Sequence, residues 1–124
     1  MYRNDHSELT EISAKEVVLS FVEALNQEDF TAARKYTSDD LEFRGVLGSR
    51  DGADAYFKDM EKMKFKYHIE KIFGNGDDVC LLYNIDMSGT NIFTCGWYHV
   101  EDGKIDSLKV IFDPRPVLEK QNKK

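Results

Sequence analysis

Long apolar runs are missing from this 124-residue chain, and their absence argues against a membrane-spanning helix. No stretch approaches the roughly 20 apolar residues that a membrane-spanning helix needs. The first six residues are polar and lack the apolar segment of a secretory signal peptide. We therefore expect no membrane partner and, by default, a cytoplasmic location.

Cysteine and histidine are scarce as well. Cys80 and Cys95 stand apart in strand-like apolar runs, and the chain has no CxxC pair and no HExxH motif. No serine or cysteine lies at a recognisable nucleophile turn. We therefore expect two reduced, buried thiols, no metal, no cofactor and no catalytic triad. His68 and His99 are expected to be surface or interface residues.

Positive charge is under-represented, because 17 Lys and Arg against 23 Asp and Glu give a net charge of −6. The basic residues are interleaved with acidic ones, except in the tail 120–124. Binding to nucleic acid needs a clustered basic face, so we expect no nucleic-acid partner. The hydrophobic fraction of 41% suffices for one core. We expect a loose leader over 1–12, one domain over 13–116 and a frayed tail over 117–124.

Apolar residues recur at helical spacing in the first half of the chain. Ser13 and Glu16 match a capping box, in which each side chain bonds to the other residue's backbone. Asp29 and Gly52 precede two further apolar patterns of the same period. Together these patterns predict three helices, near residues 13–26, 30–37 and 52–63, and a short strand at 41–47.

After residue 63 the apolar period changes to two, which is typical of strands with one buried face. Short turns rich in Gly, Asn and Asp separate the runs. The pattern predicts an antiparallel meander of four strands, near residues 65–70, 79–87, 92–100 and 105–112. A sheet of this size curls by its own twist. The predicted fold is therefore α+β, a cone-shaped cup in which a curved antiparallel sheet carries three N-terminal helices on its concave face.

Several short motifs occur in a characteristic order over residues 13–116. They are Phe21-Val22-Glu23-Ala24-Leu25-Asn26 followed by Asp29-Phe30, then Asp39-Asp40, Gly52, Asp102-Gly103-Lys104-Ile105 and Phe112-Asp113-Pro114-Arg115-Pro116. In these motifs the chain resembles the nuclear transport factor 2-like superfamily, and within it the SnoaL-like branch with its ketosteroid isomerases and polyketide cyclases. The resemblance implies a cystatin-like cone. The family includes isomerases, cyclases, dehydratases, epoxide hydrolases and purely binding members, so the fold does not assign a function.

The catalytic positions of ketosteroid isomerases, carried over by motif, do not keep their chemistry. The tyrosine position falls on Phe21, which lacks the hydroxyl. The position of the base falls on or next to Gly45, beside Arg44, and that of the acid falls near Gly96. Steroid isomerisation is therefore not expected of this chain.

Asn84 and Asp86 are the first candidate site residues, and two placements are open. By the burial rule alone, this polar pair faces solvent while Tyr83, Ile85 and Met87 face the core. The register of the family instead points Leu82, Asn84 and Asp86 into the cup. A carboxylate in an apolar cup has a raised pKa, which suits general acid–base work.

Asp113 is the next candidate, either at the mouth of the cup and paired with Arg115 or simply starting a turn before Pro114. Large, adaptable side chains on the elements expected to line the cup favour an apolar ligand over a polar one, although each is also compatible with plain core packing. These pocket candidates are Phe21, Tyr36, Phe43, Tyr56, Phe57, Met60 and Tyr98.

Two functions follow. In the first, the chain is a cofactor-free enzyme acting on an apolar small molecule, with Asp86 as acid or base and Asn84 and Tyr98 as hydrogen-bond donors to an oxyanion. In the second, it is a non-catalytic ligand-binding or dimerisation domain. An inward Asp86 also leaves an apolar set on the outer sheet face, where the resemblance implies a homodimer. That set is Tyr83, Ile85, Met87, Phe93, Cys95 and Trp97.

Overall fold

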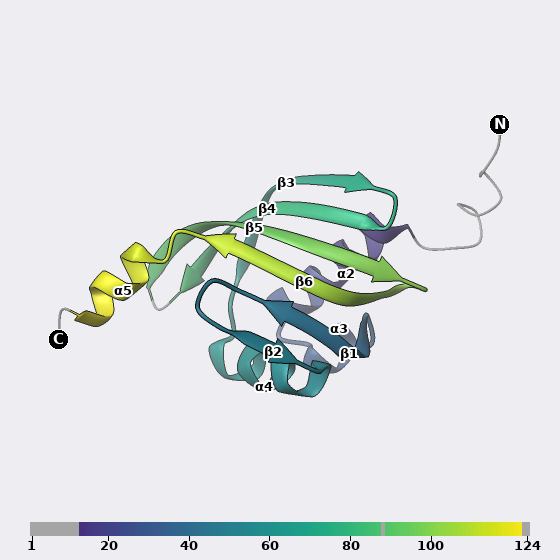
Figure 1. Cartoon of the computed structure of the whole chain (residues 1–124), viewed down its shortest axis with the longest axis horizontal. Helices are drawn as coiled ribbons and strands as arrows, with labels where there is room; N and C mark the ends of the chain where they lie inside the picture. The colour runs from purple at the N-terminus through teal and green to yellow at the C-terminus, as the bar shows by residue number, and fades with distance from the viewer. Residues whose placement is uncertain (1–12, 88, 123–124) are drawn as a thin grey trace.

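The computed structural model describes residues 13–87 and 89–122 and shows a curved, unclosed six-stranded sheet with helices packed against it (Figure 1). In this view α2 and α3 lie behind the sheet. The α+β fold predicted from the sequence is confirmed. The elements, in chain order, are α2 (Ala14–Asn26), α3 (Phe30–Arg34), β1 (Thr37–Arg44), β2 (Ser49–Asp51), α4 (Ala53–Met63), β3 (Tyr67–Asn75), β4 (Asp78–Met87), β5 (Thr90–Glu101), β6 (Lys104–Phe112) and α5 (Arg115–Asn122).

Local sequence signals set the ends of the first two helices. The Ser13–Glu16 capping box that starts α2 is present, with both side chain to backbone bonds at 3.2 Å. Asp29 caps α3 by accepting a hydrogen bond of 3.1 Å from the Ala32 backbone. Helix α3 ends at Arg34, earlier than the predicted 37, because Thr37 already begins β1.

Helix α4 begins where the sequence predicts. Its N-cap is Gly52, whose φ of 97° is open to glycine but strained for other residues. The helix ends at Met63, and the C-cap residue Lys64 adopts the left-handed conformation with φ of 51°. Tyr56, Phe57 and Met60 form its buried side. Because they recur at helical spacing, one face of α4 reaches the core.

The strand order in the sheet is β2-β1-β6-β5-β4-β3. Strands β3 to β6 form the predicted antiparallel meander. Strand β1 differs from the expectation of a wholly antiparallel sheet, because it pairs with β6 in parallel. A parallel neighbour needs a long crossover rather than a tight hairpin, and here the chain between β1 and β6 includes α4 and the rest of the meander.

Strand register assigns the side chains of β4 and β5 to the two sheet faces. On β4, Leu81, Tyr83 and Ile85 are buried against the helices, whereas Asp86 is exposed. On β5, Phe93 and Trp97 are exposed and pair across the strands with Asn84 and Cys80. The inward placement of Asn84 and Asp86 was therefore wrong, and so was the outward placement of Tyr83 and Ile85. The burial rule held because the apolar set of β4 faces the helices.

The outer sheet face is nevertheless rich in apolar side chains. The register brings them into two neighbouring rows, in which Phe73, Cys80 and Trp97 lie side by side and Leu82, Cys95 and Ile111 lie side by side. Phe93 extends the set. We call this group the outer apolar patch; it comprises Phe73, Cys80, Leu82, Phe93, Cys95, Trp97 and Ile111.

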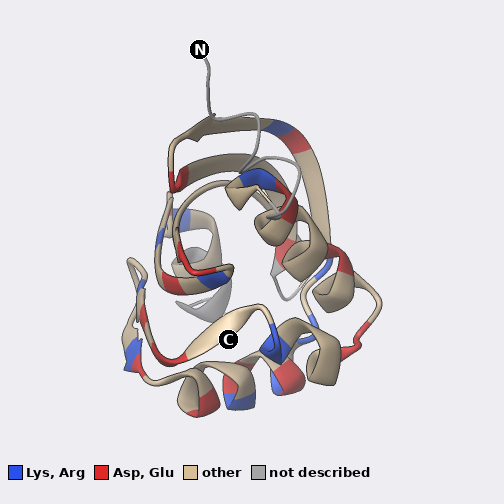
Figure 2. Cartoon of the chain, turned by 90° about the vertical axis from the view of Figure 1, so that its right-hand side faces the viewer, with Lys and Arg blue, Asp and Glu red and all other residues tan. Residues whose placement is uncertain are grey.

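The C-terminal segment forms helix α5, where the sequence had predicted a frayed tail. Its Val117 is buried and joins the core cluster. Acidic and basic residues are intermixed along the ribbon in Figure 2, as their order in the sequence suggests. No helix within the described residues is long and apolar enough to cross a membrane.

Candidate functional site

Four tyrosines from four different elements converge inside the cone. Tyr56 lies on α4, Tyr67 on β3, Tyr83 on β4 and Tyr98 on β5, and none is more than 7% exposed. The rings of Tyr67 and Tyr83 lie 5.0 Å apart, centre to centre. Phe21 of α2 joins the group, 6.3 Å from Tyr98 and 6.5 Å from Tyr56. We call Tyr56, Tyr67, Tyr83 and Tyr98 the tyrosine cluster.

The hydroxyls of the tyrosine cluster lie close to one another. Those of Tyr56 and Tyr67, and those of Tyr83 and Tyr98, are near enough to influence each other's pKa. The Tyr67 hydroxyl also lies 3.9 Å from the Met60 sulfur. Burial is the main reason that the pKa of each of these four tyrosines is raised above its ordinary value. The cluster therefore stays neutral well into the alkaline range and presents hydroxyl donors to the interior.

The surroundings of the cluster carry no charge. Among the described residues, the buried polar side chains other than these tyrosines are Thr37 and Thr94. A neutral phenol can donate a hydrogen bond to a carbonyl or to a developing oxyanion, but it is a poor base near neutral pH. The interior is thus suited to holding an oxygen-bearing apolar molecule more than to removing a proton from it.

Gly96 makes room for the Tyr83–Tyr98 pair. A Cβ atom at position 96 would lie 2.9 Å from the Tyr98 ring and 3.4 Å from the Tyr83 ring. The first distance is too short for a real contact with a ring that is itself fully packed. The resemblance placed the catalytic acid of ketosteroid isomerases near Gly96. In this chain the rings of Tyr83 and Tyr98 fill the space that a side chain at Gly96 would need.

Asp86 and Asn84 lie outside this interior. Asp86 is exposed, and Asn84 donates a hydrogen bond of 2.6 Å to Glu70 on the solvent side of the sheet. The catalytic role suggested for Asp86 therefore loses the buried environment on which it depended.

Replacing Asp86 by Asn is expected to leave the free energy of unfolding within about 0.5 kcal/mol of the wild type, because an exposed carboxylate with no structural partner is exchanged for its isostere. Chemical denaturation measures this. Ligand binding in the interior should also be unchanged, and a loss of binding in Asp86→Asn would contradict the outward placement.

The other predicted site residues fall into three groups. Buried inside the cone are Phe21, Tyr56, Phe57, Met60 and Tyr98. Phe43 is half-buried, with its ring 5.3 Å from Tyr56, and Tyr36 lines a surface groove of about 500 Å³ between α2 and α3. Asp113 is exposed and bound by Arg115 at 2.7 Å, which lowers the pKa of its carboxyl to about 2.

Sequence reasoning missed two members of the tyrosine cluster. The family register, one of the two placements left open, put Tyr83 on the outer face, and Tyr67 was interpreted only as part of an alternating strand. The available signal was the apolar alternation of β4, which placed Tyr83 with Ile85 on the core side. The side chain of Met87, also expected on the outer face, lies outside the described part of the chain.

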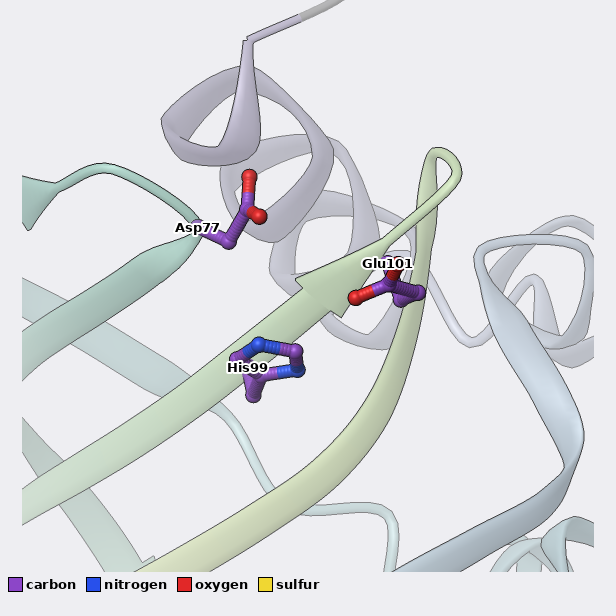
Figure 3. A group of neighbouring side chains, drawn as sticks. All are labelled: Asp77, His99 and Glu101. Atoms are coloured by element: carbon purple, nitrogen blue, oxygen red, sulfur yellow. The ribbon is translucent and has the colours of Figure 1, made fainter.

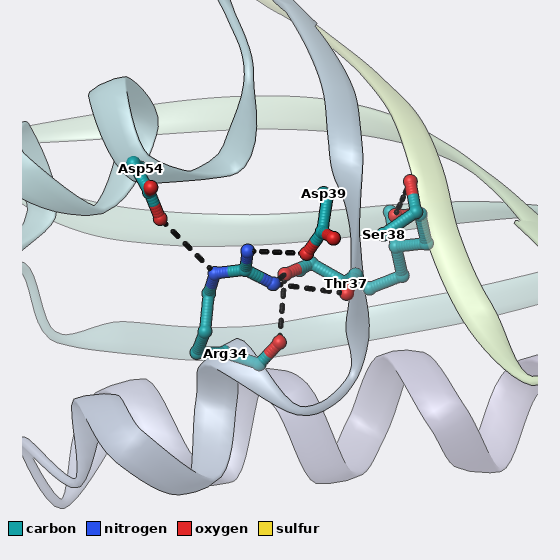
Figure 4. A network of polar contacts seen from close by, with 6 residues as sticks. Arg34, Thr37, Ser38, Asp39 and Asp54 are labelled. Atoms are coloured by element: carbon teal, nitrogen blue, oxygen red, sulfur yellow. Dashed lines mark hydrogen bonds and ion pairs between the residues drawn. The ribbon is translucent and has the colours of Figure 1, made fainter.

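Two polar clusters lie on the surface. His99 is half-exposed on the outer side of the sheet, beside Asp77 and Glu101 (Figure 3). Arg34 bonds Asp39 at 2.7 Å and Asp54 at 3.5 Å, and so ties α3 to β1 and α4 (Figure 4). Both carboxylates are more than nine-tenths exposed, so solvent screens each ion pair and its contribution to stability is small. We assign the Arg34 network a structural role.

The fold and interior define an α+β cone of the nuclear transport factor 2-like type. A family model described as the SnoaL-like domain matches residues 18–108, and the chain belongs to this SnoaL-like family. No curated protein matches the chain.

Solved structures agree with this assignment. The chain is similar to an NTF2-like protein of unknown function from Cytophaga hutchinsonii, with 50% identity and a TM-score of 0.85 over 88% of this chain and 97% of the other. It shares the fold of an LEH-like epoxide hydrolase from M. tuberculosis (23% identity, TM-score 0.74, 86% of each chain). It also shares the fold of a cystatin-fold protein from Novosphingobium aromaticivorans (16% identity, TM-score 0.74, 82% of this chain and 99% of the other).

Proposed function

We propose that this protein binds an apolar small molecule bearing a carbonyl or phenolic oxygen, inside the cone and without catalysing a reaction on it. The observation that carries the proposal is the tyrosine cluster, which supplies neutral hydroxyl donors in an otherwise apolar interior. Ligand pockets typically combine apolar walls with a few such polar groups. The interior lacks a charged base among its described buried residues, which favours binding over proton transfer.

Entry of a ligand requires side chains to move, because the aromatic rings already contact one another. Met60 and Phe57 on α4 are the best placed to move, since both belong to one helix and retain 8% and 5% exposure. Methionine is also flexible enough to repack around a guest. The aromatic rings would then contact the ligand in place of one another, and the interior would stay filled.

The matched pair of variants for testing this removes hydroxyls without changing shape. The double variant Tyr83→Phe, Tyr98→Phe removes the hydroxyls of two neighbouring tyrosines together, so neither hydroxyl is left beside a new apolar ring, and its own stability should change little. If a ligand accepts a hydrogen bond from Tyr83 or Tyr98, the double variant should bind it about fivefold more weakly than the wild type, equivalent to about 1 kcal/mol. Tyr36→Phe, which alters a tyrosine outside the cone, is the control and should bind like the wild type.

The measurement is thermal shift with pairs of compounds that differ by one oxygen, such as an apolar ketone and the corresponding hydrocarbon. A ligand at 100 times its dissociation constant stabilises the folded state by about 2.7 kcal/mol. We expect the ketone to raise the melting temperature more than the hydrocarbon, and the double variant to remove the difference. An equal shift in the double variant would contradict the proposed role of the tyrosine cluster.

A cofactor-free enzyme of the isomerase, cyclase or hydrolase type is the second candidate. The paired hydroxyls favour it, because they could stabilise an oxyanion as well as a ground-state carbonyl. Mass spectrometry of each stabilising compound after incubation distinguishes the two functions. A new product that depends on the tyrosine pair would replace the binding proposal by the enzyme.

We also propose that the protein is a homodimer joined through the outer apolar patch. Phe93 and Ile111 are 58% and 65% exposed, and Phe73 and Trp97 are about half exposed. Four large apolar side chains on one face of the sheet exceed what monomers usually leave in water. A two-fold axis through this face would bring the patch against itself, and such self-contact is how most small dimers form.

A further inference from the structure

One histidine and two carboxylates meet at the edge of the sheet, away from the tyrosine cluster. Asp77 comes from the turn between β3 and β4, while His99 and Glu101 lie near the end of β5. One ligand-type atom from each residue lies within 4.8 Å of the other two (Figure 3). Figure 3 shows the three side chains extending into the space between the turn and the strand. The combination of imidazole and carboxylate suits first-row divalent cations better than Mg²⁺ or Ca²⁺.

A fourth residue fixes the direction of the imidazole. The Nδ1 atom of His99 lies 2.7 Å from the Asp106 carboxylate, which leaves Nε2 as the nitrogen available to a cation. Histidines that bind metals almost always have their other ring nitrogen held by a carboxylate or a carbonyl in this way. Asp106 lies outside the group of Asp77, His99 and Glu101, so the orientation of the His99 ring does not depend on the other two ligands. Hydrogen bonding to Asp106 also raises the pKa of His99, and Asp78 and Glu101 add to the shift.

The backbone that carries these ligands is held in place by its own bonds. The Val100 N–H donates to the Asp77 carbonyl at 2.8 Å, which joins the β3–β4 turn directly to β5. Next to it, the Trp97 indole donates to Asp78 at 3.0 Å. The backbone that carries the ligands is thus held by contacts that need no ion. A cation would have to order only the two exposed carboxylates.

We propose that Asp77, His99 and Glu101 bind a first-row divalent cation such as Zn²⁺, with Asp106 as a positioning residue. Tetrahedral zinc with bonds of about 2.1 Å places its ligand atoms about 3.4 Å apart. The present separations, up to 4.8 Å, close to that value by rotation of the two exposed carboxylates. Water would fill the fourth position, and the ion would clamp the β3–β4 turn to β5.

The test is calorimetric titration of the full chain with Zn²⁺. We expect one site per chain, with binding reduced at least 100-fold in His99→Gln. The chain has three histidines, so His68→Gln and His6→Gln are matched controls and should bind like the wild type. Asp106→Asn keeps all three ligands but loses the carboxylate that orients His99. The affinity of this variant for Zn²⁺ should fall by about tenfold to a hundredfold. Mg²⁺ and Ca²⁺ should not compete.

A second readout comes from the single tryptophan of the chain. Trp97 precedes His99 by two residues on the same face of β5 and bonds the neighbour of Asp77. Binding of paramagnetic Ni²⁺ should therefore quench its fluorescence in the wild type but not in His99→Gln.

Three results would overturn the proposal. One is the absence of Zn²⁺ binding to the wild type at millimolar ion concentration. Another is wild-type affinity in His99→Gln with circular dichroism unchanged. The last is binding that survives in His99→Gln but is lost in Cys80→Ser, because the Cys80 and Cys95 sulfurs lie 3.4 Å apart and could bind zinc themselves. None of these outcomes bears on the ligand proposed for the cone.

Discussion

Trp97→Glu is expected to dissociate the proposed homodimer into monomers that remain folded. Trp97 lies within the outer apolar patch, 50% exposed, with Lys109 above its ring at 4.7 Å. In a symmetric dimer the two introduced carboxylates would lose water against the apolar side chains of the partner, a cost that the neighbouring Lys109 offsets only in part. Loss of a central tryptophan alone typically costs 2 kcal/mol or more of binding energy, so self-association should weaken at least about 30-fold.

Sedimentation velocity over a range of protein concentrations measures this effect. Leu47→Glu is the matched control, because Leu47 is similarly exposed (53%) but lies in the β1–β2 turn, outside the outer apolar patch. The control should remain dimeric. Unfolding of Trp97→Glu would leave the cause ambiguous, so Ile111→Glu, at 65% exposure on β6, is the second variant. A wild-type chain that is monomeric at micromolar concentration would rule out the proposed dimer.

The second large effect is expected at high pH, where the tyrosine cluster should make the fold unusually sensitive to alkali. In the unfolded chain each tyrosine ionises near pH 10. In the folded chain burial raises all four pKa values, so the folded state keeps protons that the unfolded state loses. Their contribution to stability is therefore complete below about pH 10 and is lost as pH rises beyond it.

The size of this loss follows from the number of groups. Each raised tyrosine lowers the free energy of unfolding by up to about 1.4 kcal/mol per pH unit, so four lower it by roughly 5 kcal/mol per pH unit. We expect tyrosinate absorbance and loss of circular dichroism to appear together in one cooperative transition. The double variant Tyr83→Phe, Tyr98→Phe should halve the slope, while Tyr36→Phe should not. Ionisation of the buried tyrosines before unfolding would contradict the packed interior.

Much of the fold was predictable because its signals are local. The capping box at Ser13, the Gly52 position before α4 and the change of apolar period after residue 63 each depend on neighbours in sequence. The parallel pairing of β1 with β6 was not predictable in this way. It joins segments some 65 residues apart, such as Phe43 and Leu108, whose contact leaves no periodic trace in either strand.

The candidate site was harder to predict than the fold. A shift of one residue in strand register exchanges the two faces of a strand. Reliance on the family register placed Asp86 inward and Tyr83 outward, while the simpler burial rule placed them correctly. Even the correct faces would not have brought Tyr56 next to Tyr67, because that contact joins a helix to a strand.

The sequence by itself determined the α+β class, the SnoaL-like motifs and the approximate helix and strand positions. Its resemblance to the family also predicted that the isomerase catalytic residues are missing at Phe21, on or next to Gly45 and near Gly96. Only the tertiary structure decided which face of β4 is buried, that four tyrosines share one interior, and that His99 meets Asp77 and Glu101 at the sheet edge. The physical reason is the range of the interactions. Caps and periodicity act within a few residues, whereas a site is made by side chains that the curvature and register of the whole sheet bring together.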